Sequence, residues 1–260
     1  MILRRLSQSL KEQNWMAIGI EFVLLVVGVF LGIQVANWNV ERETNKKAFE
    51  ATEKLIADLR AESWRYQFLL EYHRDVHVAA EKTVGALSGK TPLSNEEFLV
   101  NAYRASQYKQ GASRRSTYDE LVSTGSIALI KDKKLRNVSV RAYSISTIEY
   151  MVREGIESRY RELFRMSIPN EVQRTLAKEC GDLYIAPGDY KNFDHNIDYP
   201  CKTGLPADVI DDAANALRSD PQTIRYLRHR IADLDTRLVD LTQNNRDVWE
   251  ALVEIAKEKP

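Results

Sequence analysis

The sequence has few residues that break helices and no excess of charge of either sign. Glycine occurs 11 times and proline 7 times in 260 residues. This scarcity argues against a β-sheet protein with many turns and favours long helices. Lys plus Arg number 37 and Asp plus Glu also number 37, so the formal net charge is zero. Because a nucleic-acid-binding protein usually has a basic excess, we expect no nucleic-acid partner.

Cysteine is also scarce, with only Cys180 and Cys201 present. Neither belongs to a Cys-x-x-Cys pair, which argues against a zinc site that would include His195 between them. Outside the cytoplasm the two thiols would most simply form a disulfide, and closing that loop would contribute ~3 kcal/mol. We therefore predict a Cys180–Cys201 disulfide and an irregular insert, rich in Pro, Gly, Asp and Tyr, at residues 178–206.

One long apolar run lies near the N-terminus. Residues Met16 to Ala36 read MAIGIEFVLLVVGVFLGIQVA, matching the ~20 residues needed to cross a hydrocarbon layer ~30 Å thick. Trp15 and Trp38 bracket the run, as is typical of membrane interfaces. A cleavable signal peptide needs small residues before the cut, whereas the bulky Gln34 precedes Ala36 by two positions. We predict an uncleaved membrane anchor.

The anchor divides the chain into three parts. We predict a cytoplasmic tail at residues 1–14, amphipathic or flexible, a transmembrane helix at 15–38, and a helical extracytoplasmic domain at 39–260. Basic residues are balanced on the two sides of the anchor, so charge alone does not decide the orientation. A short N-terminal tail before a large C-terminal domain fits a signal anchor with its N-terminus in the cytoplasm. The domain would then lie on the periplasmic side.

Four residues of the anchor share one helix face. Leu25, Gly28 and Gly32 follow Glu21 at intervals of 4, 7 and 11 residues. The Gly-x-x-x-Gly spacing lets two helices approach closely in lipid, and an ionisable group at this depth is costly unless it is covered. We predict that this face associates with a second copy or with another membrane protein. The alternative is that Glu21 reaches the interface and that the glycines are incidental.

The same segment carries a resemblance to a known family. Residues Glu21 to Gly28 follow the pattern E-x-x-L-x-V-x-G, and Gln34 and then Asn37-Trp38-Asn39 come after it. This pattern resembles the N-terminal signature of a family of uncharacterised bacterial single-span membrane proteins, and a looser resemblance continues over 117–130. The resemblance implies residence in the bacterial inner membrane. It carries over no catalytic residue and no cofactor.

Beyond the anchor the apolar pattern is helical. A seam at heptad spacing runs from Phe49 to Leu87, so the anchor helix is predicted to continue outward and to end at Gly89. Ser94-x-x-Glu97 is a capping box that opens a helix, and Ser116 begins a short helix that Gly125 terminates.

Two further helices are predicted in the second half. Asp132 caps a helix that continues past Ile156, and Asp220 with Pro221 starts a last helix that reaches Ile255 with a period of 3.5 residues. The first and last helices have complementary lengths, which favours packing within one chain over packing between copies. The predicted fold class is all-α, with a single N-terminal transmembrane helix that continues into a long-helix bundle or coiled coil.

His73 and His77 lie one turn apart on the predicted seam, with Glu81 one turn further. This geometry can hold a metal ion. However, Arg74 occupies the position where a zinc protease has glutamate. We favour structural or partly exposed histidines over a metal site.

The aromatic and acidic residues of the insert suggest either a recognition surface or packing over the bundle, and we favour packing. These residues are Tyr184, Tyr190, Phe193, Asp194 and Tyr199.

No nucleophile, base and orienting group can be assembled from the motifs, so we expect no enzyme and no cofactor. The favoured function is a membrane-anchored interaction or scaffold protein that assembles with itself or with a membrane partner. The alternative is a sensor that binds a small ligand or metal near the two histidines and acts through a partner. A polar cavity around the histidines would favour sensing, and a filled core would favour the scaffold.

Overall fold

The computed structural model describes residues 15–192 and 196–257, and these contain helices and loops but no β-strand. The all-α prediction is therefore confirmed. The predicted tail at 1–14 lies outside the described residues.

The helices follow one another with short connections, except for the segment 106–115 between α3 and α4 and the long loop between α8 and α9. Their bounds are α2 Trp15–Leu87, α3 Asn95–Ala105, α4 Ser116–Ser123, the 3₁₀ turn η1 Ser126–Leu129, α5 Lys133–Ser144, α6 Thr147–Ile156, α7 Arg159–Ser167, α8 Asn170–Glu179, α9 Ala207–Ser219, α10 Pro221–Val239, the π-helical turn η3 Asp240–Asn244 and α11 Arg246–Lys257.

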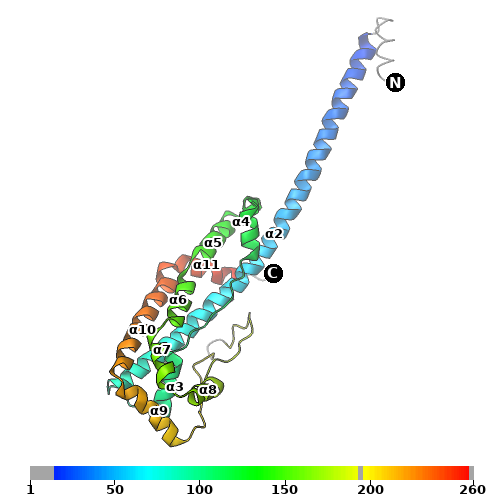
Figure 1. Ribbon diagram of the computed structural model, residues 1–260. Helices are drawn as coiled ribbons and strands as arrows, with labels where there is room; N and C mark the ends of the chain where they lie inside the picture. Colours follow the sequence, from blue (N-terminus) through cyan, green and yellow to red (C-terminus); the bar gives the residue numbers. More distant parts are fainter. Residues whose placement is uncertain (1–14, 193–195, 258–260) are drawn as a thin grey trace.

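Helix α2 is the axis of the molecule. It has 73 residues and is therefore about 110 Å long at a rise of 1.5 Å per residue. Its N-terminal half extends away from the bundle, and its C-terminal half runs through the middle of the other helices (Figure 1). No residue between Trp15 and Lys47 is buried. The predicted continuation of the anchor into the domain is thus present as one unbroken helix.

In the C-terminal half of α2, the buried surface is wider than the predicted heptad seam. Leu59 and Tyr66 of the seam are buried, and so are Leu55, Leu69 and Val76, which form a second row. The prediction is wrong at Phe49, whose side chain is 66% exposed. At this level the domain covers the Ala48 side of the helix, and the adjacent Phe49 faces outward.

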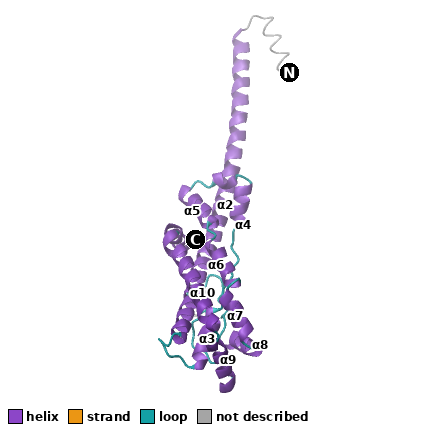
Figure 2. Cartoon of the chain, turned by 60° about the vertical axis from the view of Figure 1, so that its left-hand side comes forward, coloured by secondary structure: helices purple, strands orange, loops and turns teal. Residues whose placement is uncertain are grey.

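The other helices surround this inner half of α2. Helix α3 turns back along it, and α10 and α11 also pack directly against it. Figure 2 shows the same arrangement from another side. The predicted packing of the first and last helical regions within one chain is therefore confirmed. One apolar cluster joins α2 to α5, α6 and α11, and a second joins α3 to α7, α8 and α9.

Local capping signals start the helices where the sequence predicts. The Ser94 hydroxyl accepts from Glu97 N, and Glu97 accepts from Ser94 N, so the capping box of α3 is complete. Asp132 accepts two backbone N–H groups at the start of α5, and Asp220 accepts one at the start of α10. Gly125 follows α4 with φ at 70°, a left-handed conformation that costs glycine little.

The helix predicted from Asp132 past Ile156 is wrong because the structure divides it. Ile145 has extended backbone dihedrals, φ −79° and ψ 117°, and separates α5 from α6. Ser and Thr residues surround this position, and such side chains compete for backbone groups; Ser144 Oγ donates to Val140 O at 2.6 Å. The break allows Tyr143 and Ile148 to face the same core.

The last predicted helix is also wrong as a single element. The π-helical turn η3 and the non-helical Asn245 end the straight segment, after which α11 turns across α2 (Figure 1). Asn245 donates twice to Asp240 O, from its backbone N at 3.2 Å and from its side-chain Nδ2 at 2.8 Å, which fixes the end of the turn. The change of direction carries Val248 and Leu252 onto the core. The short helices α8 and α9 are not among the predicted elements.

Candidate functional site

The predicted association face of the anchor is uncovered at Leu25, Gly28 and Gly32, and half-buried at Glu21. Gly28 and Gly32 have open space where a side chain would begin, with no atom within 4 Å. Leu25 is exposed, and Glu21 Oε2 has no hydrogen-bond partner among the described residues. This part of α2 is long and apolar enough to cross a membrane.

The two predicted histidines bind different partners. His73 is fully buried, and its Nδ1 lies 2.7 Å from Leu69 O. Burial lowers the pKa of His73 to about 3, and the nearby Arg230 guanidinium acts in the same direction. The ring is therefore neutral at physiological pH, which argues against a role for His73 in sensing pH near neutrality.

His77 instead lies at the edge of the bundle. Its Nε2 is 2.7 Å from Asp235 Oδ1, and its Nδ1 is 3.7 Å from Glu81 Oε2. The described residues hold no group of three or more His, Cys, Asp or Glu side chains arranged for a metal ion. The proposed metal site at His73 and His77 thus has no assembled ligand set within residues 15–192 and 196–257.

The two cysteines are joined. Cys180 and Cys201 form a disulfide with their Cα atoms 5.5 Å apart. The enclosed loop folds back on itself, because Leu183 N donates to Asn196 O at 2.8 Å and Asn196 Nδ2 donates to Leu183 O at the same distance. Tyr199 OH also donates to Gly181 O at 2.7 Å.

Two side chains of α2 hold this loop against the bundle. Tyr72 OH donates to Asp182 Oδ1 at 3.0 Å, and Trp64 Nε1 donates to Asp189 O at 3.1 Å. The loop is therefore a fixed wall beside α2. Of the aromatic and acidic loop residues for which packing was favoured over recognition, Phe193 and Asp194 lie outside the described residues.

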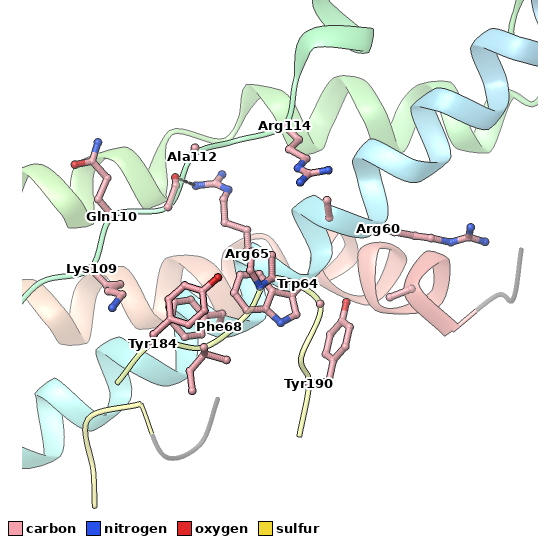
Figure 3. A pocket seen from close by; sticks show the side chains of 16 residues that line it. Arg60, Trp64, Arg65, Phe68, Lys109, Gln110, Ala112, Arg114, Tyr184 and Tyr190 are labelled. Carbon is pink, nitrogen blue, oxygen red and sulfur yellow. Dashed lines mark hydrogen bonds between the residues drawn. The ribbon is translucent and has the colours of Figure 1, made fainter. Parts of the chain in front are cut away.

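A cleft of about 620 Å³ opens between this loop and α2. Its floor is α2, one wall is the 109–114 segment after α3, the other wall is the 184–190 part of the disulfide loop, and Ala256 of α11 lies at one end. Figure 3 shows these parts converging; we call the space the α2 cleft. Its lining is mainly apolar.

Aromatic side chains form much of the α2 cleft. Trp64 and Phe68 are stacked, with ring centroids 4.8 Å apart and planes 9° apart. Tyr184 and Tyr190 of the disulfide loop lie near this stack (Figure 3). Tyr184 is 86% exposed although it borders an apolar floor, and burial raises the pKa of Tyr190, which keeps it a neutral phenol.

All the charged residues that line the α2 cleft are cationic. Arg60, Arg65, Lys109 and Arg114 line it, and no Asp or Glu does. Two of these charges are balanced from behind the lining: Arg65 Nε donates to Glu62 Oε1 at 2.9 Å, and Lys109 Nζ lies 2.9 Å from Asp182 Oδ2. Arg60 Nε donates to Ile255 O at 3.3 Å.

Arg65 also contacts the wall formed by the 109–114 segment. Its guanidinium donates to Gly111 O at 3.3 Å, and a Cβ added at Gly111 would lie 3.2 Å from Arg65 Cγ. Glycine at this position therefore allows the 109–114 segment to approach α2 closely. The sequence offers no spacing that links the residues lining the α2 cleft, since they come from four segments distant in the chain. Only Tyr184 and Tyr190 were singled out, with recognition as the alternative to packing.

Comparisons with protein-family models, with curated proteins and with solved structures found no match. The α2 cleft offers binding groups, but its lining contains no carboxylate, histidine, cysteine or serine to serve as a base or nucleophile.

Proposed function

We propose that this protein is a non-enzymatic, membrane-anchored interaction protein of the bacterial inner membrane. Its N-terminus lies in the cytoplasm and its helical domain in the periplasm. The main support for this proposal is the single helix α2, whose apolar half has no buried residue and whose other half is the core of the domain. The Cys180–Cys201 disulfide supports a location outside the cytoplasm, because disulfides persist in oxidising compartments.

The open face of the anchor at Gly28 and Gly32 supports assembly of the protein through its membrane helix. Lipid is as apolar as a leucine side chain, so association in the membrane depends on close packing and polar contacts. Gly28 and Gly32 allow a second helix to approach, and that helix would move Glu21 from lipid into a protein interface. Because α2 is unbroken, such pairing would also set the spacing of the two domains.

Crosslinking of the full chain in membranes tests this assembly. Gly28→Leu fills the proposed interface, whereas the matched Gly19→Leu lies on the opposite face of the helix. We expect an amine-reactive crosslinker, acting through Lys46 and Lys47 of the exposed stalk, to join two wild-type copies. Gly28→Leu should reduce that product several-fold, and Gly19→Leu should leave it unchanged.

Monomer alone in the wild type, or equal loss in both variants, would contradict self-association. A different membrane protein captured by the wild type and lost with Gly28→Leu would instead identify docking to a partner.

A second candidate function is ligand sensing, and the α2 cleft favours it. Sensing near His73 lacks support, because that ring is enclosed in a filled core. A ligand in the α2 cleft would contact α2, the disulfide loop and the segment after α3 together. Occupancy could therefore alter the surface that the domain presents to a membrane partner.

A further inference from the structure

We propose that the α2 cleft binds a soluble organic anion, with a carboxylate or phosphate group attached to a flat apolar ring. This inference rests on the ligand-sensing candidate and not on self-association of the anchor. It requires three features: a cationic side chain without an acidic partner in the described part of the chain, a flat apolar contact surface, and access from water.

The positive charge comes from the lining of the α2 cleft, which includes cationic side chains and no acidic ones. Four cationic side chains line the cleft with no acidic residue among them, in a chain whose net charge is zero. The Arg114 guanidinium has no hydrogen bond or ion pair with any residue in the described part of the chain, and it extends from its segment toward α2 (Figure 3). An arginine presents several donors in a planar fork that fits carboxylate and phosphate oxygens. Arg114 is thus the expected anion contact.

The apolar contact comes from the rings below. The stacked pair Trp64 and Phe68 is held in place by the bond from Trp64 to the disulfide loop. Tyr184 stands exposed beside it, and covering an exposed aromatic ring with another flat ring is favourable. The cleft volume of about 620 Å³ falls within the range of roughly 300–1,000 Å³ that is usual for small-molecule sites.

The position of the cleft identifies the source of the ligand. Trp64 follows Ala36, the end of the apolar run, by 28 residues, which at 1.5 Å per residue is about 42 Å along α2. The headgroup layer extends only about 5–8 Å beyond the hydrocarbon. A lipid headgroup in the bilayer therefore cannot reach the cleft, and the ligand must arrive from water.

Calorimetric titration of the full chain in nanodiscs tests the proposal with three probes. Phenyl phosphate carries both the ring and the anion, inorganic phosphate carries the anion alone, and benzylamine carries the ring with a positive charge. We expect saturable binding of phenyl phosphate, with a Kd about 10-fold or more below that of inorganic phosphate, and no binding of benzylamine. Changing the nanodisc lipid from zwitterionic to anionic should leave the Kd unchanged.

Arg114→Gln should raise the Kd for phenyl phosphate about 10-fold, because a charge-assisted hydrogen bond is lost. Its matched control is Arg225→Gln, an exposed position on α10 that does not line the cleft. Both side chains are exposed, so neither change should affect folding. Equal affinity in the two variants, benzylamine binding as tight as phenyl phosphate, or no saturable binding to the wild type would each overturn the assignment. The crosslinking result for Gly28→Leu does not depend on any of these outcomes.

Discussion

The two halves of α2 belong to one helix but are adapted to different surroundings. From Trp15 to Lys47 no residue is buried, although most of the first part is apolar. From Ala48 onward the helix carries charged residues, yet Glu62, Arg65 and His73 are among its buried side chains. The more apolar half is thus the one that the protein leaves bare.

This contrast shows that hydrophobicity alone does not identify a protein core. A core helix of a soluble domain would be covered by its own chain, whereas none of the most apolar window of α2 is buried. Lipid is the natural cover for such a surface. The inner half instead buries polar side chains that pair with one another, as the ion pair between Arg65 and Glu62 illustrates.

The largest expected effect comes from matched truncations in the two halves. Leu69 is fully buried and Leu31 is 56% exposed. Leu69→Ala should destabilise the domain by about 2–5 kcal/mol, because it removes buried methyl groups and leaves a cavity. Leu31→Ala should leave the unfolding free energy of the domain unchanged. Urea denaturation of the full chain in detergent micelles measures both, and similar losses would contradict the division of α2 into two environments.

The second effect concerns the buried imidazole of the inner half. The pKa of His73 is lowered from 6.5 to about 3 in the folded protein, so between these values the unfolded chain binds a proton that the folded chain does not. The stability from the neutral ring is complete above pH 6.5 and falls as the pH decreases toward 3. The loss is about 1.4 kcal/mol per pH unit, or about 2 kcal/mol between pH 6.5 and 5.

His73→Gln removes this titration and supplies the comparison. Urea unfolding at pH 6.5 and pH 5 should show a loss in the wild type that exceeds the loss in His73→Gln by about 2 kcal/mol. The remaining ionisable groups are common to both proteins and cancel in the difference. Equal pH dependence in the two proteins would mean that the ring is accessible to protons in the folded state.

The smallest effect is expected where the two halves meet. Phe49 continues the heptad seam in sequence but is 66% exposed, whereas Leu59 on the same seam is fully buried. Phe49→Ser should therefore change the unfolding free energy by less than about 0.5 kcal/mol, and Leu59→Ser should destabilise the domain strongly. A large loss for Phe49→Ser in detergent would reveal a contact that a single chain does not provide, such as packing between copies.

Local signals in the sequence predicted where several helices start, but not where the longer helical patterns are interrupted. The helix starts at Ser94, Asp132 and Asp220 were recognisable because a cap needs only residues within one turn. The breaks at Ile145 and Asn245 were not, since helical periodicity continues through both. There the chain leaves the helix so that the next segment can reach a distant core.

The candidate site divides in the same way. Tyr184 and Tyr190 could be singled out because they lie in an irregular segment rich in Pro, Gly, Asp and Tyr. The four cationic side chains of the α2 cleft could not, because they lie on segments far apart in sequence. Gly111, which allows the 109–114 segment to approach α2 closely, belongs to no motif. Conversely, His73 and His77 form a recognisable motif, and folding gives each a separate partner.

By itself, the sequence determined the all-helical class, the apolar run long enough to cross a membrane, the positions of the caps and the availability of one cysteine pair. These properties depend on composition and on contacts within a few residues. Only the tertiary structure decided which sides of α2 are covered, where long helical patterns are interrupted, and that a cationic, aromatic cleft exists. Those features arise from contacts between segments distant in the chain, whose mutual positions no local pattern encodes.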